Sequence, residues 1–460
     1  MRPYLLIDFG STYTKMTAVD LDEPKVLGTS RALTTVQDGL LVGYRRALEQ
    51  LHQRIGILEY QKRLACSSAA GGLKMAAVGL VPELTVEAAK RAALGAGARV
   101  IRTYGYELTP DEVQELVGLQ PDLVLLAGGT DGGNARVLLH NADQLSKSVL
   151  ATPIILAGNK SAAPEAEKIL TSAGKECYRV ANVLPELNRL NIEPVQQTIR
   201  ELFFKRIIHA KGLDQVERLI DGITMPTPAA ALDAATLLAD GPEGRGGLGE
   251  LLLIDVGGAT TDVHSVAQGA PTDPQVSLRG LPESRVKRTV EGDLGMRYSA
   301  QALLETVSAG AVAKRSGLPE GTVIEGVTRR SRNVTYLPQD QEDWLLEAAL
   351  GYLAVAGAVE RHVGRIEKFY TPSCLSYIQT GKDLTRLPVL IGTGGILAHS
   401  SAPGEILRGA LFDPVRPEFL KPQAPKLWFD RDYLLPTLGL IAKTHPQAAF
   451  SLLKQALHPA

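Results

Sequence analysis

Two aspartates in this chain of 460 residues stand in the same sequence context. Residues 4–19, YLLIDFGSTYTKMTAV, align without a gap with residues 251–266, LLLIDVGGATTDVHSV, and seven of the sixteen positions are identical. Chance would give about one identity at ordinary residue frequencies. In each copy an aspartate, Asp8 or Asp255, ends an apolar run and precedes a glycine turn. The repeat predicts two related lobes, each opened by the same β-hairpin.

The turn after each aspartate has the composition of a phosphate-binding loop. Glycine removes side-chain bulk, so a phosphate can approach the backbone N–H groups closely, and nearby Ser and Thr hydroxyls add donors. An aspartate at the end of the incoming strand can hold hydrated Mg²⁺, which prefers one or two carboxylates together with phosphate oxygens and waters. Two facing hairpins would bracket the β- and γ-phosphates of ATP. We therefore expect ATP and Mg²⁺ as cofactors, with Asp8 and Asp255 as metal ligands and catalytic residues.

A third glycine-rich segment follows an apolar run late in the chain. Residues 387–400, LPVLIGTGGILAHS, predict a strand that leads through a glycine turn into a helix. Glycines there let the backbone pass close to a flat ligand, while the helix N-terminus faces phosphate or ribose. Taken alone, the segment fits a simple strand-to-helix turn equally well. If Gly394 lines an adenosine pocket, Gly394→Val should weaken ATP binding and leave ligand-free stability nearly unchanged.

Together the three segments resemble the ATPase superfamily of actin, sugar kinases and heat-shock chaperones. The resemblance spans almost the whole chain and implies an α/β fold, a two-lobed actin-like ATPase with duplicated ribonuclease H-like lobes and an inserted α/β subdomain. The first lobe would cover residues 1–240, with the insertion at about 84–180, and the second lobe residues 241–460, with a C-terminal helix returning toward the first. Residues 225–232 and 433–442 resemble the two helices that connect the lobes.

The resemblance also implies which residues contact the nucleotide. In that family the first phosphate loop matches residues 8–15, the second matches residues 255–262, and the adenosine loop matches residues 392–396. The implied nucleotide-binding residues are Gly10, Ser11, Thr12, Thr14 and Lys15 in the first loop, Gly257, Gly258, Thr260 and Thr261 in the second, Glu291 and Asp293 in the turn that follows, and Gly392, Thr393, Gly394 and Gly395 in the adenosine loop.

One departure from the superfamily bears on hydrolysis. The chaperone branch usually carries an acidic residue just before the proline of the first connecting helix, where this chain has Met225. Hydrolysis is therefore expected to be slow or to use another acid. Asp262, Glu291 and Asp293 are the candidates, and we predict Asp262 as a catalytic residue. For Asp293 the alternative is that it caps a helix predicted at residues 296–305.

Within the superfamily, the sequence resembles the MutL/GlmL group, accessory proteins of adenosylcobalamin-dependent glutamate mutase and related aminomutases. The residues that carry this resemblance are IDFGSTYTK, PDLVLLAGGTDGGN with PIILAGNK, IDVGGATTDVHSV with KRTVEGDLGMRYSA, and IGTGGILAH. Such proteins are taken to be reactivating chaperones that exchange damaged cobalamin for intact cofactor at the expense of ATP. The resemblance implies a mutase as the partner.

Periodicity predicts the elements that would position these loops. The first hairpin is followed by an amphipathic helix within residues 40–60 and a strand at 63–66. From about 84 to 180, strands and helices alternate, which favours a parallel sheet covered by helices. The segment AGGTDGGN at residues 127–134 follows a predicted strand there, so it would bind a phosphate or a partner loop, or simply form an exposed turn around Asp131. Residues 192–211 predict a long helix, and 241–249 a linker.

Composition excludes several classes of partner and site. Lys plus Arg (49) nearly balances Asp plus Glu (50), so nucleic acid and anionic membrane are not expected partners, whereas a homo-oligomer is compatible with this composition. Cys66, Cys177 and Cys374 lie far apart, which disfavours a zinc or iron–sulfur site. The chain opens without the apolar core of a signal peptide, and a cytoplasmic location is expected.

Two other functions compete with the chaperone. A small-molecule kinase of the same superfamily would need a second substrate pocket and a base near the γ-phosphate, for which Asp255 or Asp262 is available. A filament-forming scaffold is the third possibility. Phosphate transfer to a metabolite distinguishes the kinase, and light scattering with ATP distinguishes the filament.

Overall fold

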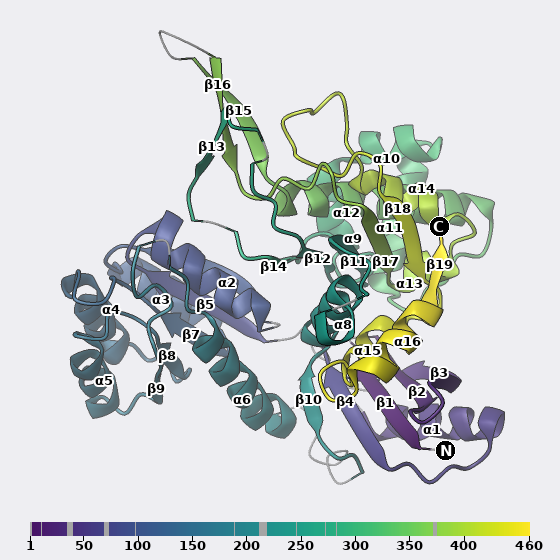
Figure 1. Ribbon diagram of the computed structural model, residues 1–460, viewed down its shortest axis with the longest axis horizontal. Coiled ribbons are helices and arrows are strands. Elements are labelled where there is room, and N and C mark those ends of the chain that lie inside the picture. The colour runs from purple at the N-terminus through teal and green to yellow at the C-terminus, as the bar shows by residue number, and fades with distance from the viewer. Residues whose placement is uncertain are drawn as a thin grey trace. The chain divides into compact units, whose positions relative to one another are not determined.

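The computed structural model divides the chain into two compact units (Figure 1). Unit 1 consists of Met1–Ala70, Gly212–Arg279 and Glu283–Ala460, and unit 2 of Gly71–Lys211 and Gly280–Pro282. The residues that the structure describes are 2–10, 12–34, 40–68, 73–96, 98–187, 189–210, 219–244, 246–271, 273–281, 283–370 and 375–460.

The first sheet of unit 1 carries the first predicted hairpin. Its strands are, in sheet order, β10 (Ile223–Pro226), β4 (Lys62–Ser67), β1 (Pro3–Phe9), β2 (Tyr13–Asp20) and β3 (Lys25–Leu33). β1 pairs antiparallel with β2, whereas β4 is parallel to β1 and β10 is parallel to β4. Helix α1 (Leu40–Ile55) packs on β2 and β3. The predicted hairpin, helix and following strand are confirmed.

The second sheet of unit 1 carries the second hairpin. Its strands are, in sheet order, β14 (Val286–Glu291), β12 (Thr261–Val266), β11 (Leu251–Val256), β17 (Val389–Thr393), β18 (Lys426–Asp430) and β19 (Leu457–Pro459). β11 pairs antiparallel with β12 and parallel with β17, and β18 is parallel to β17. The predicted apolar strand before the third glycine segment is therefore β17, the neighbour of β11.

The repeat found in the sequence extends to five strands in each sheet. The order β3-β2-β1-β4-β10 corresponds strand for strand to β14-β12-β11-β17-β18. In both sheets a three-stranded antiparallel meander is continued by two parallel strands. This duplicated arrangement confirms the predicted fold class, an α/β protein with two related sheets.

In each repeat one helix follows the last parallel strand, and these two helices pack against each other. They are α8 (Thr227–Asp240), after β10, and α15 (Leu435–Gly439), after β18. Both belong to one apolar core with β1 and β11, to which they contribute Ala234 and Leu438. At Gly439 a Cβ atom would lie 1.9 Å from the carbonyl oxygen of Ala230, so only glycine permits this crossing. The segments predicted as connecting helices are thus α8, longer than expected, and α15, shorter than expected.

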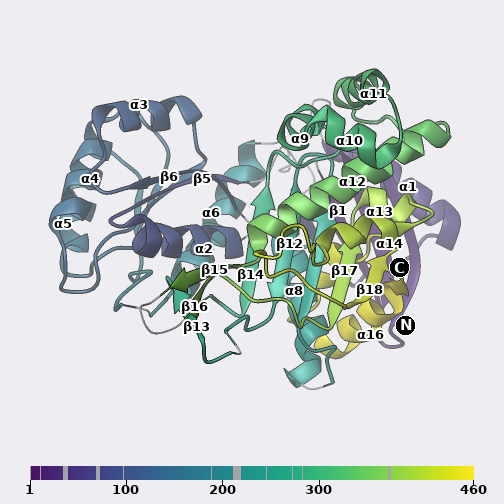
Figure 2. The same ribbon diagram turned by 90° about the horizontal axis from the view of Figure 1, so that it is seen from above.

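The helices that follow β14 cover the opposite face of the second sheet. Alternate residues of β11 belong to two different apolar cores. Leu251 and Leu253 pack in the core that contains α8, whereas Leu252 and Ile254 pack in the core that contains α12. Figure 2 shows the long helix α12 crossing this sheet. The helices that follow β14 are α9 (Ala300–Val307), α10 (Ala309–Ser316), α11 (Glu320–Arg332) and α12 (Gln341–His362).

Unit 1 also contains a small third sheet and several short helices. A three-stranded sheet, β13 (Val276–Arg279), β16 (Leu375–Thr380) and β15 (Arg365–Tyr370), projects from the body of the unit in Figure 1. The last helices are α13 (Gly395–His399), α14 (Pro403–Leu407) and α16 (Pro446–Ala456). Gln455 of α16 donates a hydrogen bond to the carbonyl of Pro24, which lies before β3. No helix among the described residues is long and apolar enough to cross a membrane.

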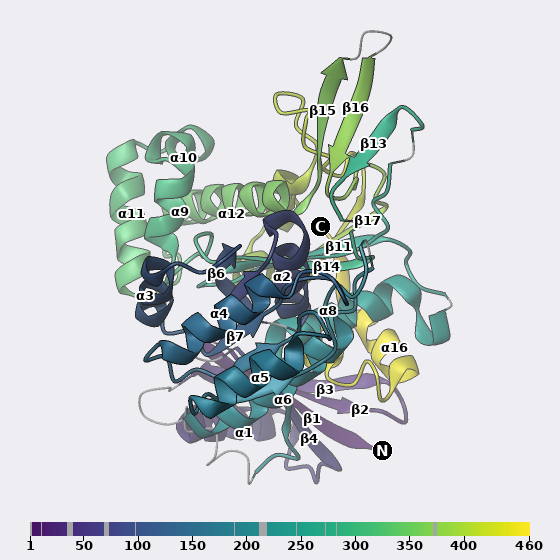
Figure 3. The ribbon, with the colours of Figure 1, turned by 90° about the vertical axis from the view of Figure 1, so that its left-hand side faces the viewer.

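Unit 2 is a parallel sheet with helices around it (Figure 3). Its strands are, in sheet order, β6 (Arg99–Gly105), β5 (Lys74–Gly79), β7 (Leu123–Leu126), β8 (Ile154–Leu156) and β9 (Cys177–Arg179), all parallel. In chain order this is 2-1-3-4-5, a doubly wound arrangement. The helices are α2 (Glu87–Gly95), α3 (Pro110–Leu119), α4 (Arg136–Lys147), α5 (Ala163–Ser172) and α6 (Glu193–Ala210).

The unit is larger than the insertion expected from the sequence. The alternation predicted over residues 84–180 is present, but β5 and α6 extend the compact unit to Gly71–Lys211. β5 was not predicted because MAAV is too short and alanine-rich to show a strand pattern. The division of the chain into lobes at residues 240 and 241 stays a prediction.

A buried polar network ties the third sheet of unit 1 to the second. The Lys382 ammonium, fully buried, donates to the Ser265 hydroxyl over 3.1 Å and to the Arg285 carbonyl over 2.8 Å. The Ser265 hydroxyl also lies 2.8 Å from Nε2 of His362, at the end of α12. Burial, with smaller contributions from the charges of Lys287 and Arg285, lowers the pKa of Lys382 to about 7, while Glu283 and Glu250 oppose this shift.

This network predicts a pH dependence of stability. Between pH 7 and 10 the unfolded chain binds a proton at Lys382 that the folded chain has released, so the free energy of unfolding should rise with pH. Lys382→Met removes this contribution. Wild type should gain up to about 1 kcal/mol per pH unit relative to the variant over this range. Urea denaturation at several pH values measures it, with the exposed Lys426→Met as the control, and parallel curves for wild type and Lys382→Met would contradict it.

Candidate functional site

Asp8 and Lys15 lie opposite each other across the first hairpin. They are paired in the register of β1 and β2, and Nζ of Lys15 is 3.9 Å from Oδ2 of Asp8. The hydroxyl of Thr227, the first residue of α8, donates to Oδ1 of Asp8 over 2.6 Å. Oδ2 of Asp8 is buried without a hydrogen-bond partner. Burial raises the pKa of Asp8, whereas the charge of Lys15 and the bond from Thr227 oppose that rise.

Asp255 occupies the equivalent position in the second hairpin. Its partner across β11 and β12 is Asp262, which stands where the first hairpin has Lys15. Oδ1 of Asp255 is buried without a hydrogen-bond partner. Burial, together with the charges of Asp262 and Asp8, raises the pKa of Asp255 to about 7, and Lys15 opposes this rise. The two hairpins therefore place their aspartates around one lysine.

Tyr433, which precedes α15, touches both hairpins. Its hydroxyl donates to Oδ2 of Asp255 over 3.3 Å, and Nζ of Lys15 lies 2.9 Å from the centre of its ring. Neither Tyr433 nor Thr227 was predicted as a site residue, although both lie in or beside the segments identified as connecting helices. Only the fold brings them to the carboxylates, because each is more than 150 residues from the aspartate it contacts.

The two turns also approach each other. A Cβ atom built on Gly258 would lie 3.6 Å from the hydroxyl oxygen of Thr12. The amide of Gly10 closes its own turn on the carbonyl of Tyr13, and the amide of Gly257 does the same on that of Thr260. Ser11 lies outside the described residues. The structure thus brings Asp8, Gly10, Thr12, Lys15, Asp255, Gly257 and Gly258 together in one region of unit 1.

Two threonines of the predicted site point away from this region. Thr14 is buried, and its hydroxyl lies 3.1 Å from that of Thr34. Thr261 is also buried and donates to the carbonyl of Leu294 over 2.6 Å. Both hydroxyls fasten the turns to neighbouring segments, so a contact with nucleotide through either stays a prediction without support from the geometry.

Asp262 is held by an ion pair that the sequence did not indicate. The Arg288 guanidinium donates to its Oδ1 through Nε over 2.9 Å and through Nη2 over 2.5 Å. Thr260 donates to its Oδ2 over 3.0 Å. A carboxylate with both oxygens engaged in this way is poorly placed to accept a proton from a substrate. Its predicted catalytic role stays a prediction.

Glu291 and Asp293 both pair with Arg361 on α12. Nη1 of Arg361 lies 2.8 Å from Glu291 and 2.6 Å from Asp293, and Nη2 lies 2.8 Å from Asp293. These contacts lower the pKa of Asp293. The suggestion that Asp293 caps the next helix is wrong, because α9 begins at Ala300 and Asp293 instead accepts a bond from Thr306 within it. Contact of either carboxylate with a nucleotide stays a prediction.

The third glycine segment is shaped by its own packing. At Gly392 a Cβ atom would lie 2.6 Å from side chains of Leu397 and Leu407, and the buried hydroxyl of Thr393 donates to Asp430 over 3.0 Å. Gly394 has a φ of +109°, and its Cβ atom would lie 2.3 Å from the carbonyl oxygen of Val256. A Cβ atom at Gly395 would meet nothing within 4 Å. Of the four residues, Gly395 alone has open space beside it.

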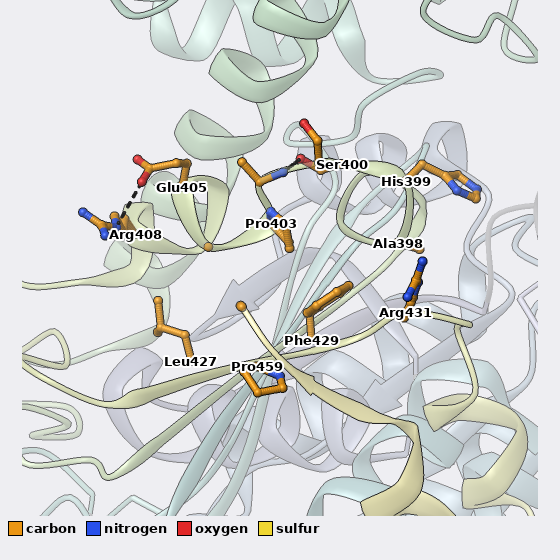
Figure 4. A pocket seen from close by; sticks show the side chains of 14 residues that line it. Ala398, His399, Ser400, Pro403, Glu405, Arg408, Leu427, Phe429, Arg431 and Pro459 are labelled. Atoms are coloured by element: carbon orange, nitrogen blue, oxygen red, sulfur yellow. Dashed lines mark hydrogen bonds and ion pairs between the residues drawn. The ribbon is translucent and has the colours of Figure 1, made fainter.

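A pocket of about 740 Å³ adjoins the far end of this segment (Figure 4). Figure 4 shows His399 and Arg431 on one side of it, with Phe429 and Pro403 facing its interior. The residues lining it include neither the aspartates of the hairpins nor residues 392–395. The pocket is therefore separate from the carboxylate region, and its proximity to α13 alone assigns it no ligand.

The carboxylate region fits hydrated Mg²⁺ held beside phosphates. Oδ2 of Asp8 and Oδ1 of Asp255 are buried oxygen acceptors without hydrogen-bond partners. A closed metal site made only of protein ligands needs three or more His, Cys, Asp or Glu side chains in one group. Among the described residues there is no such group. One or two carboxylates with open coordination positions are what Mg²⁺ bound to a nucleotide requires.

In unit 2, the glycine loop at residues 127–134 is held by buried asparagines. Asn159 accepts from the amide of Gly132 over 3.0 Å, and Asn182 donates to the carbonyl of Gly129 and to Asp131, each over 3.0 Å. The side chain of Asp131 also accepts from the amide of Lys160 over 2.9 Å. Asp131 is therefore a structural anchor of the loop, and the expected exposed turn around it is confirmed, since Gly132, Gly133 and Asn134 are exposed.

Comparison with known proteins identifies the family. The model of the MutL protein family matches residues 4–457. A curated relative, Protein MutL of Clostridium tetanomorphum, is 49% identical over 99% of this chain and 99% of its own. This chain belongs to the MutL family. The duplicated aspartates and glycine turns thus lie within the residues that this family model matches.

Two solved structures are more distant. The activator of the 2-hydroxyisocaproyl-CoA dehydratase from Clostridium difficile with bound ADPNP is 9% identical, with a TM-score of 0.33, over 98% of this chain and 97% of its own. The nucleotide-free diol dehydratase-reactivating factor is 10% identical, with a TM-score of 0.34, over 97% and 100%. The family assignment rests on the sequence matches.

The packing around the glycines reverses one expectation for this MutL family member. Gly394→Val was expected to leave the ligand-free protein stable, but the positive φ and the contact with Val256 predict a loss of about 2 kcal/mol or more. Gly395→Ala should leave the melting temperature nearly unchanged. Calorimetric melting of both ligand-free variants checks this, and equal melting temperatures would contradict the assignment.

Proposed function

We propose that this protein is an ATP-binding and ATP-hydrolysing reactivating chaperone for an adenosylcobalamin-dependent mutase, glutamate mutase or a related aminomutase. The observation that carries the nucleotide part is the pair of aspartates near Lys15, each with a buried oxygen that has no hydrogen-bond partner. Membership of the MutL family supports the choice of partner. The same site suits ATP and Mg²⁺ as cofactors.

In this proposal different residues of the two hairpins bind the metal and the phosphates. Asp8 and Asp255 would hold hydrated Mg²⁺, and its charge would stabilise the phosphoryl transition state. Thr227 fixes the orientation of Asp8 through its bond to Oδ1, leaving Oδ2 for the metal or its waters. Lys15 and the backbone N–H groups of the turns bind the phosphates.

The connecting helices supply the means to transmit nucleotide binding. Thr227 at the start of α8 contacts Asp8, and α8 packs directly on α15, whose first residues are fixed by Asp430. A nucleotide that favours one arrangement of these two helices shifts the population toward it. A bound mutase is affected only if its affinity differs between the two arrangements.

Hydrolysis is proposed to be slow. Met225, at the position of the acidic residue in the chaperone branch, packs against the apolar core shared by α8 and α15. Among the acids considered, Asp262, Glu291 and Asp293 are engaged by arginines. This leaves Asp8 and Asp255 as the acids of the two hairpins without an arginine partner in the contacts described above.

The first test concerns the aspartates. Asp8→Asn and Asp255→Asn preserve shape but remove the charge that holds Mg²⁺, so each should reduce Mg²⁺-dependent ATP turnover by roughly 10²-fold or more. Calorimetry and phosphate release measure binding and turnover. Asp111→Asn, at an exposed aspartate in unit 2, is the control. Unaltered binding and turnover in both hairpin variants would overturn the site.

The second test concerns the partner. Mutase inactivated by damaged cobalamin should regain activity with this protein, Mg-ATP and fresh cofactor, and Asp255→Asn should fail to restore it. Charge reversal of the exposed Lys160, beside the glycine loop of unit 2, should impair rescue without affecting ATP binding, whereas Lys168→Glu on α5 should not. If glutamate mutase and ornithine aminomutase both stay inactive while a metabolite is phosphorylated, the kinase function replaces the chaperone.

A further inference from the structure

Tyr433 adopts a backbone conformation that is unusual for its residue type. Its φ of +56° lies in the left-handed region, which favours glycine and costs a tyrosine conformational energy. The residue stands in the turn between β18 and α15. That turn is fixed by Asp430, which accepts the amides of Leu434 over 2.9 Å and of Leu435 over 2.8 Å. The surroundings therefore hold Tyr433 in a conformation that it would not adopt by itself.

This conformation delivers the phenol to the centre of the carboxylate region. Nζ of Lys15 lies 2.9 Å from the ring centre but 3.9 Å from Oδ2 of Asp8, so the ammonium contacts the ring more closely than the carboxylate. At its other end the phenol donates to Oδ2 of Asp255 over 3.3 Å. The ring thus fills the space between the cation of the first hairpin and the acid of the second.

We propose that Tyr433 is an internal competitor of phosphate, which occupies Lys15 and Asp255 in the nucleotide-free protein and must leave when a nucleoside triphosphate binds. This inference rests on the proposed function, because it takes Lys15 and Asp255 as groups that bind phosphate and metal. A ring over an ammonium and a phosphate beside that ammonium exclude each other sterically. Tyr433 therefore sets the affinity for nucleotide without contributing to the chemistry.

The hydrogen bonds of Asp430 connect the turn that contains Tyr433 to the third glycine segment. Thr393, at the end of β17, donates to the same oxygen of Asp430 that accepts the amide of Leu435. The strand leading to Gly394 and the first turn of α15 are thus fixed to one buried carboxylate. Displacement of Tyr433 would act on the start of α15, the helix that packs on α8. Tyr433 therefore stands between the proposed phosphate-binding residues and the two connecting helices, α8 and α15, that nucleotide binding would shift.

The inference predicts a gain of affinity on truncation. Tyr433→Ala removes both the contact with Lys15 and the bond to Asp255, so Mg-ATP should bind more tightly, by roughly 3- to 30-fold. Tyr433→Phe keeps the ring and loses the bond, and its affinity should fall between those of wild type and Tyr433→Ala. Alanine is preferred to glycine because it keeps the backbone restriction at this position.

Isothermal calorimetry with Mg-ATP on the full chain is the first measurement. The matched control is Tyr106→Ala, since Tyr106 also has a left-handed φ, of +65°, and its side chain is exposed in unit 2. It should leave the affinity unchanged. Equal or weaker binding by Tyr433→Ala, with wild-type binding intact, would overturn the competition and leave the proposed function standing.

A second measurement does not depend on nucleotide. If the ring covers Lys15, modification of its amine by acetic anhydride, followed by mass spectrometry, should be faster in ligand-free Tyr433→Ala than in wild type or Tyr106→Ala. Equal rates would overturn the inference. Absence of Mg-ATP binding in both wild type and Tyr433→Ala would instead overturn the proposed function, and the competition with it. A structure with bound Mg-ATP in which Tyr433 still contacts Lys15 and Asp255 would also refute the competition.

Discussion

The placement of two aspartates, Asp8 and Asp255, near a single lysine, Lys15, is the main electrostatic constraint on the two hairpins of unit 1. Asp8 is 1% exposed, and both it and Asp255 have pKa values raised mainly by burial. Burial also lowers the pKa of Lys15, while both aspartates favour its charged form. Neighbouring like charges are tolerated only if protons, the lysine or an added cation compensate them. Lys15 supplies part of this compensation, because its charge opposes the rise in the pKa of both aspartates.

Duplication explains the geometry, and divergence explains the charges. Both hairpins place an aspartate opposite the residue seven positions later, because the register of the two antiparallel pairs is the same. In the first repeat that residue is Lys15, and in the second it is Asp262. A second acid beside Asp255 would be costly if left alone, so Arg288 on β14 neutralises it. The repeats thus share one backbone but carry side chains of opposite charge at the same position.

The parts of the site that the sequence predicts are those made within a short stretch of chain. The hairpins, their aspartates and their glycine turns follow from local composition and from the repeat. Thr227 and Tyr433 escape prediction because their partners are 219 and 178 residues away. Glu291 and Asp293 appeared available for a nucleotide because nothing near them in sequence indicates Arg361. Gly394 looked like a pocket residue, whereas its contact with Val256 belongs to the packing of β17 on β11.

Glycine-rich segments carry different information in the two units. In unit 1, Gly258 lies close to the other hairpin, and a Cβ atom there would be in ordinary van der Waals contact with Thr12. In unit 2, the glycines of residues 127–134 are flanked by Asn159 and Asn182, whose side chains take up the backbone groups of the loop. A loop secured in this way keeps one shape without a ligand. Such internal hydrogen bonds account for the glycines and asparagines of this loop without any ligand.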